Sequence, residues 1–155
     1  MEYDMAIRDV PAQRIAAVRA TTAMDKVGEA LGSGWGQLFG TLGAAGAAPS
    51  GPPFAIYHRY GGESGEVELE ACVPTTADIA APAPVVVRDE PAMTVAATLH
   101  KGPYNEIGGA YEALQTWIAA QGRHIAGPPR EVYLTDPAQV TDPAEYLTEA
   151  QWPVV

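Results

Sequence analysis

Two β-type stretches of this sequence carry carboxylates at positions where they could do chemistry. The first, residues 127–137 (GPPREVYLTDP), opens with a Gly-Pro-Pro turn signal and continues as a short strand-like run. Because side chains alternate along a strand, Glu131 and Tyr133 would share one face, whereas Val132 and Leu134 would form the core face. A mid-strand carboxylate beside a phenol can hold a cation or activate a water. The alternative is that Glu131 and Tyr133 belong to a solvated outer face.

The second stretch, residues 66–74 (EVELEACVP), shows the most regular alternation in the chain. Glu66, Glu68, Glu70 and Cys72 would share one face of this strand, opposite an apolar face. Three carboxylates in a row are typical of a solvated face. If the face lined a cleft instead, the cleft would have strongly negative walls, and Glu68 and Glu70 would be ligand-binding residues.

Several other chemistries lack their sequence signatures. The chain has no phosphate-binding G-x-x-x-x-G-K-[ST], no G-x-S-x-G and no H-E-x-x-H. The histidines His58, His100 and His124 show no metal-ligand spacing with each other or with Cys72, so we expect neither a metal nor a cofactor. His100, which precedes Lys-Gly-Pro, is better explained as a hydrogen-bonding residue at a strand end than as a catalyst.

Length, net charge and cysteine count indicate how many domains the chain forms and which kinds of partner it can have. The 155 residues suit a single domain, 1–155, with a substantial core. The 9 Lys and Arg against 19 Asp and Glu give a formal net charge of −10, which disfavours a nucleic-acid partner. The single cysteine excludes a disulfide framework. No signal peptide or membrane span is visible, so we expect a soluble cytoplasmic protein with no membrane partner.

The elements that must position these residues follow from periodicity and turn signals. Two helices are expected, one from Met24 to Leu42, bent or broken near Gly32-Ser33-Gly34, and one from Tyr104. The second helix carries a stripe of apolar residues: Ile107, Tyr111, Leu114 and Ile118, with Trp117 beside it. Strands are expected from about Arg14, at 54–60, 66–74, 85–87 and 94–100, and near the chain end.

The two halves of the chain look like copies of each other. The segment DVPAxxIAA at residue 9 matches DEPAxxVAA at residue 89, an offset of 80. Gly-Pro-Pro at 51 matches Gly-Pro-Pro at 127, an offset of 76. We therefore expect repeat 1 at about 1–80 and repeat 2 at about 81–155, each running strand, helix, strand, strand. Within the helices the offset of 76 aligns Trp35 with Tyr111, Leu38 with Leu114, Leu42 with Ile118 and Gly46 with Gly122.

A duplicated β-α-β-β unit predicts an α+β fold with one antiparallel sheet. Both helices would cover one side, and a pseudo-twofold axis would create a ligand cleft between the halves. Under the offset of 76, Ala55 and Tyr57 occupy the places of Glu131 and Tyr133. Two tyrosines would then face each other near the axis with only one carboxylate. The alternative is that both tyrosines simply pack with their hydroxyls at the rim.

The second half of the chain resembles the GyrI-like small-molecule-binding domain, which is also the effector-binding half of multidrug-responsive transcription regulators. The matching pieces are HKGPY at 100–104, AYxxLxxWI at 110–118, GPxxExY at 127–133, LTE at 147–149 and PV at 153–154. The resemblance implies the duplicated fold and a cleft glutamate that engages lipophilic cations, at the position of Glu131. It also implies aromatic side chains that stack on flat ligands. The expected ligand-binding residues are Glu131, Tyr133, Tyr57, Glu70, Glu68, Trp35, Tyr104 and Tyr111.

Three functions remain open. The leading one is binding or sequestration of amphipathic, often cationic, aromatic small molecules, with Glu131 selecting charge. Because residues 1–6 precede the segment 7–20, which contains the first expected strand, we expect a stand-alone domain that does not bind DNA directly. Since some GyrI-like proteins hydrolyse cyclopropane-bearing genotoxins, the second function is hydrolysis with Glu131 as catalytic general base. The third is inhibition of a DNA-binding protein partner such as gyrase, through the acidic face of Glu66, Glu68 and Glu70.

Overall fold

The computed structural model describes residues 3–61 and 63–155. Across these residues the chain forms two α-helices and eight β-strands whose pairings are antiparallel, an α+β fold. The elements divide between two compact units. One unit is Pro11–Ala92, and the other joins strand β1, Met5–Val10, to Met93–Val155.

The unit Pro11–Ala92 is a four-stranded sheet with one helix. Its strands are β2, β3, β4 and β5, and they lie in the order β3-β4-β2-β5. Their bounds are Gln13–Ala23, Phe54–Tyr60, Glu66–Pro74 and Val86–Glu90, and helix α1 spans Val27–Ala44. The strand predicted at 85–87 is thus β5, which begins one residue later and extends to Glu90.

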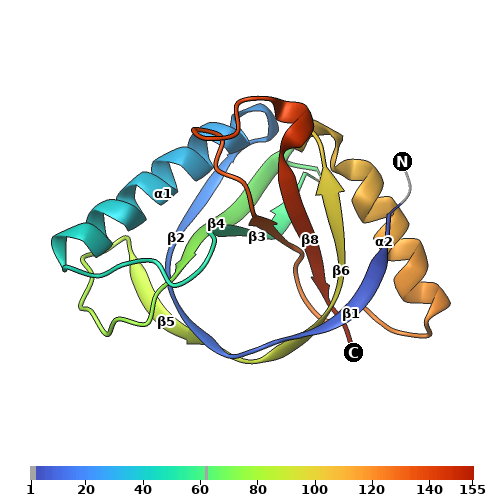
Figure 1. Ribbon diagram of the computed structural model, residues 1–155, viewed down its shortest axis with the longest axis horizontal. Coiled ribbons are helices and arrows are strands. Elements are labelled where there is room, and N and C mark those ends of the chain that lie inside the picture. Colours follow the sequence, from blue (N-terminus) through green and yellow to red (C-terminus); the bar gives the residue numbers. More distant parts are fainter. Residues whose placement is uncertain (1–2, 62) are drawn as a thin grey trace. The chain divides into compact units, whose positions relative to one another are not determined.

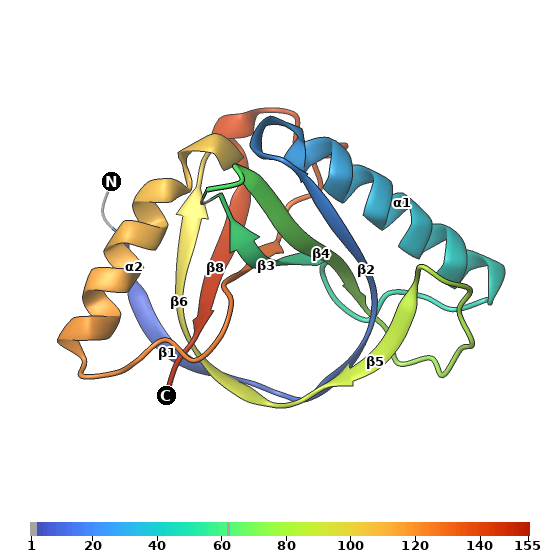
Figure 2. The same ribbon diagram turned by 180° about the vertical axis from the view of Figure 1, so that it is seen from behind.

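Helix α1 is continuous, so the predicted break near Gly32-Ser33-Gly34 is wrong. The helix stays continuous because it packs against β2 and β4. Figure 2 shows α1 running beside β2. A Cβ at Gly34 would lie 2.8 Å from Cβ of Ala71 and 3.0 Å from Cγ1 of Val18. Gly34 therefore brings the helix close to the sheet, and the apolar contacts offset the low helix propensity of glycine.

The second unit has the same plan. Its strands lie in the order β1-β6-β8-β7, and α2 packs against β6 (Figure 1). The bounds are Met93–Lys101 for β6, Arg130–Tyr133 for β7, Leu147–Pro153 for β8 and Gly108–Ala120 for α2. Strand β1 lies ahead of the first strand that the sequence predicted, and it pairs with β6. The core beneath α2 consists of Ala96, Leu114, Ile118, Ala150 and Val154.

The predicted duplication is confirmed by residues in equivalent places. β2-α1-β3-β4 and β6-α2-β7-β8 each run strand, helix, strand, strand. The aligned helix residues are buried in both copies: Leu38 with Leu114, and Leu42 with Ile118. Gly46 and Gly122 follow their helices with φ of 69° and 71°, the left-handed conformation that ends a helix and that glycine adopts without strain.

Candidate functional site

Strand β7 directs Glu131 toward helix α2. Glu131 lies opposite Ala150 of β8, and residues directly opposite each other in a sheet share a face. Ala150 belongs to the core under α2, together with Leu114 and Ile118. The carboxylate of Glu131 therefore occupies the helix-covered face of its sheet, and the residue is only 8% exposed.

The Glu131 carboxylate accepts a hydrogen bond at each oxygen. The Tyr111 hydroxyl of α2 donates to Oε2 at 2.8 Å, and the Tyr133 hydroxyl donates to Oε1 at 2.9 Å. Burial of a carboxylate is costly unless such donors replace the lost water. The two phenols supply hydrogen bonds to the carboxylate without adding a positive charge.

Further aromatic rings hold these two phenols. The Tyr104 ring meets the Tyr133 ring edge-on at 5.6 Å and stacks on Tyr146 at 4.9 Å. The Tyr111 ring meets the Trp152 ring edge-on at 5.7 Å. Burial raises the pKa of the Tyr104 phenol, and the nearby Tyr146 and Asp136 act in the same direction. Tyr104 therefore stays neutral at physiological pH.

The predicted core face of this strand is wrong. Val132 is only partly buried and Leu134 is 48% exposed, whereas Glu131 and Tyr133 are buried. Strand β7 ends at Tyr133, so Leu134 lies beyond the ladder. The polar face can be the buried one because the phenol of Tyr111, twenty residues away in sequence, satisfies the carboxylate.

In the unit Pro11–Ala92 the equivalent places are filled as the offset predicts. Ala55 pairs with Ala71 as Glu131 pairs with Ala150, and Tyr57 pairs with Leu69 on the same face. Because residue 55 is an alanine, this repeat has no carboxylate at the equivalent position. Ala55 is fully buried. Tyr57 is buried and meets Tyr60 edge-on at 5.9 Å. The predicted ligand residue Trp35 lies on α1 and is partly buried.

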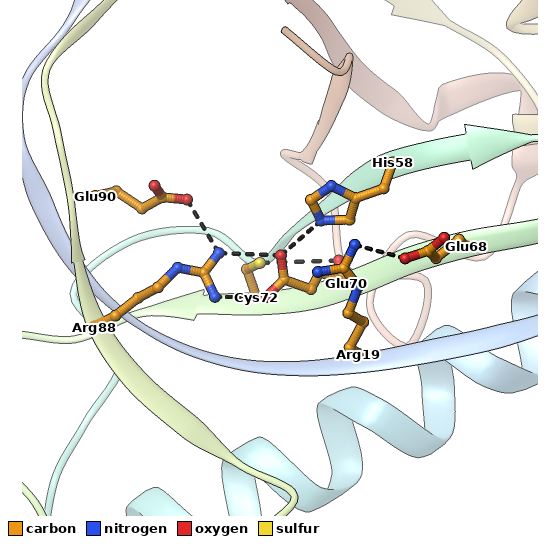
Figure 3. Close-up of polar contacts among 7 residues, drawn as sticks. All are labelled: Arg19, His58, Glu68, Glu70, Cys72, Arg88 and Glu90. Carbon is orange, nitrogen blue, oxygen red and sulfur yellow. Dashed lines mark hydrogen bonds and ion pairs between the residues drawn. The ribbon is translucent and has the colours of Figure 1, made fainter.

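Glu70 lies on the opposite face of that sheet from Tyr57, where Arg88 and His58 contact its carboxylate (Figure 3). The Arg88 guanidinium donates through Nη1 to Oε2 and through Nη2 to Oε1 at 3.0 Å. His58 Nε2 lies 2.8 Å from Oε1, and Arg88 also contacts Glu90 at 3.3 Å. Burial by itself would raise the pKa of Glu70, but the hydrogen bonds and charges of Arg88 and His58 hold it below its usual value.

The three glutamates predicted to share one face of β4 therefore differ in how exposed they are. Glu66 is exposed, Glu68 is partly exposed in an ion pair with Arg19 at 2.6 Å, and Glu70 is buried. Strand β4 lies between β3 and β2, which makes it an inner strand of its sheet. The expectation of a solvated face holds for Glu66 but is wrong for Glu70, because Arg88 from β5 covers it.

The GyrI-like small molecule binding domain matches residues 3–155, essentially the full chain. The chain belongs to this family. No curated protein shows significant sequence similarity to it.

Solved structures share the GyrI-like fold. An EcmrR–DNA complex matches with a TM-score of 0.87 and 25% identity over 98% of this chain, which spans 57% of that chain. The EcmrR C-terminal domain matches with a TM-score of 0.85 and 24% identity, over 100% of this chain and 99% of the EcmrR domain. A hydrolase encoded by lin2189 from Listeria innocua matches with a TM-score of 0.72 and 13% identity, over 97% of this chain and 91% of the hydrolase chain. SAV2435 bound to tetraphenylphosphonium matches with a TM-score of 0.62 and 15% identity, over 100% of this chain and 94% of the SAV2435 chain.

Within this GyrI-like chain, the structure brings four of the predicted residues into one cluster, and the other four belong to the other unit. Glu131, Tyr133, Tyr104 and Tyr111 lie together in one unit. The other four belong to the unit Pro11–Ala92, where Tyr57 lies on one sheet face and the two carboxylates on the other: Tyr57, Trp35, Glu68 and Glu70.

Two aromatic residues of the cluster were missed from the sequence, namely Tyr146 and Trp152. Period-two alternation along β8 would have found them, because Tyr146, Thr148, Ala150 and Trp152 are spaced by two. Tyr146 directly precedes this strand, and Trp152 lies near its end.

His100 confirms the prediction of a hydrogen-bonding role. Its ring is fully buried, with Nε2 3.1 Å from the carbonyl oxygen of Pro103 and Nδ1 3.0 Å from the Tyr3 hydroxyl. A carbonyl only accepts, so Nε2 donates to Pro103, and in a neutral imidazole Nδ1 would accept from the Tyr3 hydroxyl. In the described part of the chain no three or more His, Cys, Asp or Glu residues are grouped to hold a metal, and no helix is long and apolar enough to cross a membrane.

Proposed function

We propose that this GyrI-like chain binds amphipathic, cationic aromatic small molecules beside Glu131, which selects for positive charge. The observation that carries the proposal is a buried carboxylate held by two phenols within a set of aromatic rings. The phenols are uncharged donors that keep the carboxylate in place, and a cation would gain by approaching the carboxylate.

Each part of the cluster contributes to affinity for such a ligand. The aromatic faces of Tyr104, Tyr133 and Tyr111 attract a cation by about 0.5–2 kcal/mol each when it is desolvated. Apolar contact adds affinity that does not depend on charge. The carboxylate of Glu131 then distinguishes a cation from a neutral molecule of the same shape.

The relatives support the same ligand class. SAV2435, which shares the fold, is bound to tetraphenylphosphonium, a lipophilic cation. The family description itself specifies small-molecule binding. Sequestration of such molecules in the cytoplasm is the biological role that we propose for the chain.

A fluorescence titration with planar cationic dyes tests this function. We expect several dyes to bind in the micromolar range and a neutral dye of similar size to bind more weakly. Failure of every lipophilic cation to bind at high micromolar concentration would contradict the proposal.

The hydrolase alternative uses the same Glu131 as a general base. Both oxygens of Glu131 accept hydrogen bonds from phenols, and this fixed arrangement suits a carboxylate that receives a cation better than a base that must activate a water. Mass spectrometry of a cyclopropane-bearing alkylator incubated with the protein separates the two, because catalysis requires more than one turnover per chain.

The protein-inhibitor alternative depends on an exposed acidic edge. Among the described residues, β4 is an inner strand, Glu70 is buried against Arg88, and Glu68 is paired with Arg19. This arrangement favours ligand binding over inhibition of a basic partner. A pull-down at low salt that recovers a basic DNA-binding protein would reverse that preference.

A further inference from the structure

His100 lies on the same sheet face as the cluster that contains Glu131. The residue is fully buried near the end of β6. It lies opposite Thr148 of β8, and Thr148 lies opposite Tyr133 of β7. Residues directly opposite each other share a face of a sheet, and so do residues two apart along a strand. The imidazole therefore occupies the helix-covered face that also carries Tyr133 and Glu131.

The Nε2 atom of His100 holds the turn that follows β6. It donates to the carbonyl oxygen of Pro103 at 3.1 Å. This carbonyl begins the 3₁₀ turn Tyr104–Glu106, and it also accepts from the last amide of that turn at 3.1 Å. The Gly102 amide donates to the carbonyl oxygen of Tyr146 at 2.8 Å. The segment that leads into α2 is thus fixed by a side chain of β6 and by a backbone hydrogen bond to the residue before β8.

Tyr104, the first residue of this turn, carries a ring of the cluster. The ring stacks on Tyr146 at 4.9 Å and meets the Tyr133 ring edge-on at 5.6 Å. The Tyr133 hydroxyl in turn donates to Glu131 at 2.9 Å. Because a peptide unit is planar, the direction of the Pro103 carbonyl sets the orientation of the unit that contains the Tyr104 nitrogen. A group that holds this carbonyl therefore influences where the Tyr104 ring lies.

We infer that His100 is a positioning residue of the ligand site, which holds the Pro103 carbonyl so that the Tyr104 ring faces the cluster. The inference rests on the proposed function, because it assumes that cations bind beside Glu131. The other ring nitrogen, Nδ1, lies 3.0 Å from the hydroxyl of Tyr3, which belongs to the segment before β1. That second hydrogen bond reaches a residue outside the cluster, so its loss should not change ligand affinity.

Two substitutions separate the two hydrogen bonds of His100. A glutamine side chain places an N–H donor near the position of Nε2, whereas the shorter asparagine side chain reaches only the position of Nδ1. His100→Gln should therefore keep the bond to Pro103, and His100→Asn should keep only the bond to Tyr3. In titration with a planar cationic dye, we expect His100→Asn to bind about two- to thirtyfold more weakly than wild type, the range for one cation–aromatic contact. His100→Gln should restore binding to the wild-type level.

Fluorine NMR without ligand reports the position of Tyr104 directly. The protein is labelled with fluorotyrosine, and the Tyr104 resonance is identified by its absence from Tyr104→Phe. We expect this resonance to shift in His100→Asn and to stay at its wild-type position in His100→Gln. A general loss of stability would not produce this difference, because both variants remove the same imidazole.

Tyr3→Phe is the matched control, because it removes the hydrogen bond at Nδ1 and leaves the one at Nε2. Its dye affinity and its Tyr104 resonance should match wild type. The double variant Tyr3→Phe with His100→Gln keeps only the bond to Pro103, and it should also bind the dye like wild type. This comparison decides the matter even where His100→Asn fails to fold.

Several results would overturn the inference while cation binding stays intact. They are wild-type affinity in His100→Asn, equal losses in His100→Asn and His100→Gln, and weakened binding in Tyr3→Phe or in the double variant. An unshifted Tyr104 resonance in folded His100→Asn would overturn it as well. Failure of every cationic dye to bind wild type would refute the proposed function itself, and the inference with it.

Discussion

At the scale of single residues, two buried carboxylates are treated differently by their surroundings. Glu70 receives hydrogen bonds from a guanidinium and an imidazole, whereas Glu131 receives them from two phenols. The Arg88 charge balances Glu70 within the protein, so we assign Glu70 to stability. The phenols add no positive charge at Glu131, and we propose that Glu131 serves in ligand selection.

Arg88→Met should destabilise the protein by leaving Glu70 buried without its cation. Loss of one partner of a buried pair costs about 3–5 kcal/mol, and because the Arg88 side chain is 34% exposed we expect about 2–4 kcal/mol. Urea unfolding measures the change. The control is Arg19→Met, whose pair with Glu68 is more exposed and should cost about 0–1 kcal/mol. Equal losses in the two variants would contradict the assignment of Glu70.

Glu70 also predicts how stability depends on pH. Its pKa is lowered in the folded protein, while an unfolded glutamate has a pKa of about 4.3. The stability that ionised Glu70 contributes is therefore present above about pH 4.3 and is lost as the pH falls through the lowered folded pKa. In Glu70→Gln this contribution to the loss should be absent. Urea unfolding at a series of pH values below about 5 measures the free energy of unfolding for each variant. Exposed Glu66 of the same strand provides the control, and Glu66→Gln should retain the wild-type slope.

At the scale of elements, the glycines of α1 divide into one with a packing role and others without one. Gly34 meets Ala71 and Val18, whereas a Cβ at Gly36 would meet nothing within 4 Å. This difference could not be predicted from the sequence, because it depends on a strand that lies more than thirty residues further along the chain.

Gly34→Ala and Gly36→Ala should consequently change stability in opposite directions. The first overpacks the contact with β4 and β2 and should cost about 1–3 kcal/mol. The second adds helix propensity at an exposed position and should gain about 0.5–1 kcal/mol. Thermal and denaturant unfolding measure both, and stabilisation by Gly34→Ala would show that α1 does not approach its sheet as closely as described.

Leu114→Ala on α2 tests the best predicted helix. Leu114 is fully buried in the core with Ala96 and Ala150, so we expect a cavity and a loss of about 2–5 kcal/mol in unfolding free energy. Ile118→Ala should cost a similar amount. A change well below 1 kcal/mol in denaturant unfolding would mean that α2 is packed differently.

At the scale of the whole molecule, the sequence was sufficient for the duplicated α+β fold but not for the surroundings of each carboxylate. Matching turns and helix residues identified the repeats, because each copy keeps the same local pattern. The buried face of β7 was misjudged since a strand of four residues carries too little alternation to decide its face. The partners Tyr111 and Arg88 come from elements brought near only by tertiary packing.

The duplication also bears on how many cations a chain should bind. Ala55 stands in one repeat where Glu131 stands in the other, so only one of these two equivalent positions carries a carboxylate. We therefore expect one cation per chain.

The central claim is that the charge of Glu131 selects the ligand, and isothermal titration of Glu131→Gln tests it most directly. One cationic aromatic ligand and its neutral isostere are titrated against wild type, Glu131→Gln and the control Glu112→Gln, which removes an exposed charge from α2. The cationic ligand should lose about 1.5–3 kcal/mol with Glu131→Gln, the neutral ligand much less, and neither should change with Glu112→Gln. Equal losses for both ligands, or no loss for either, would contradict the claim.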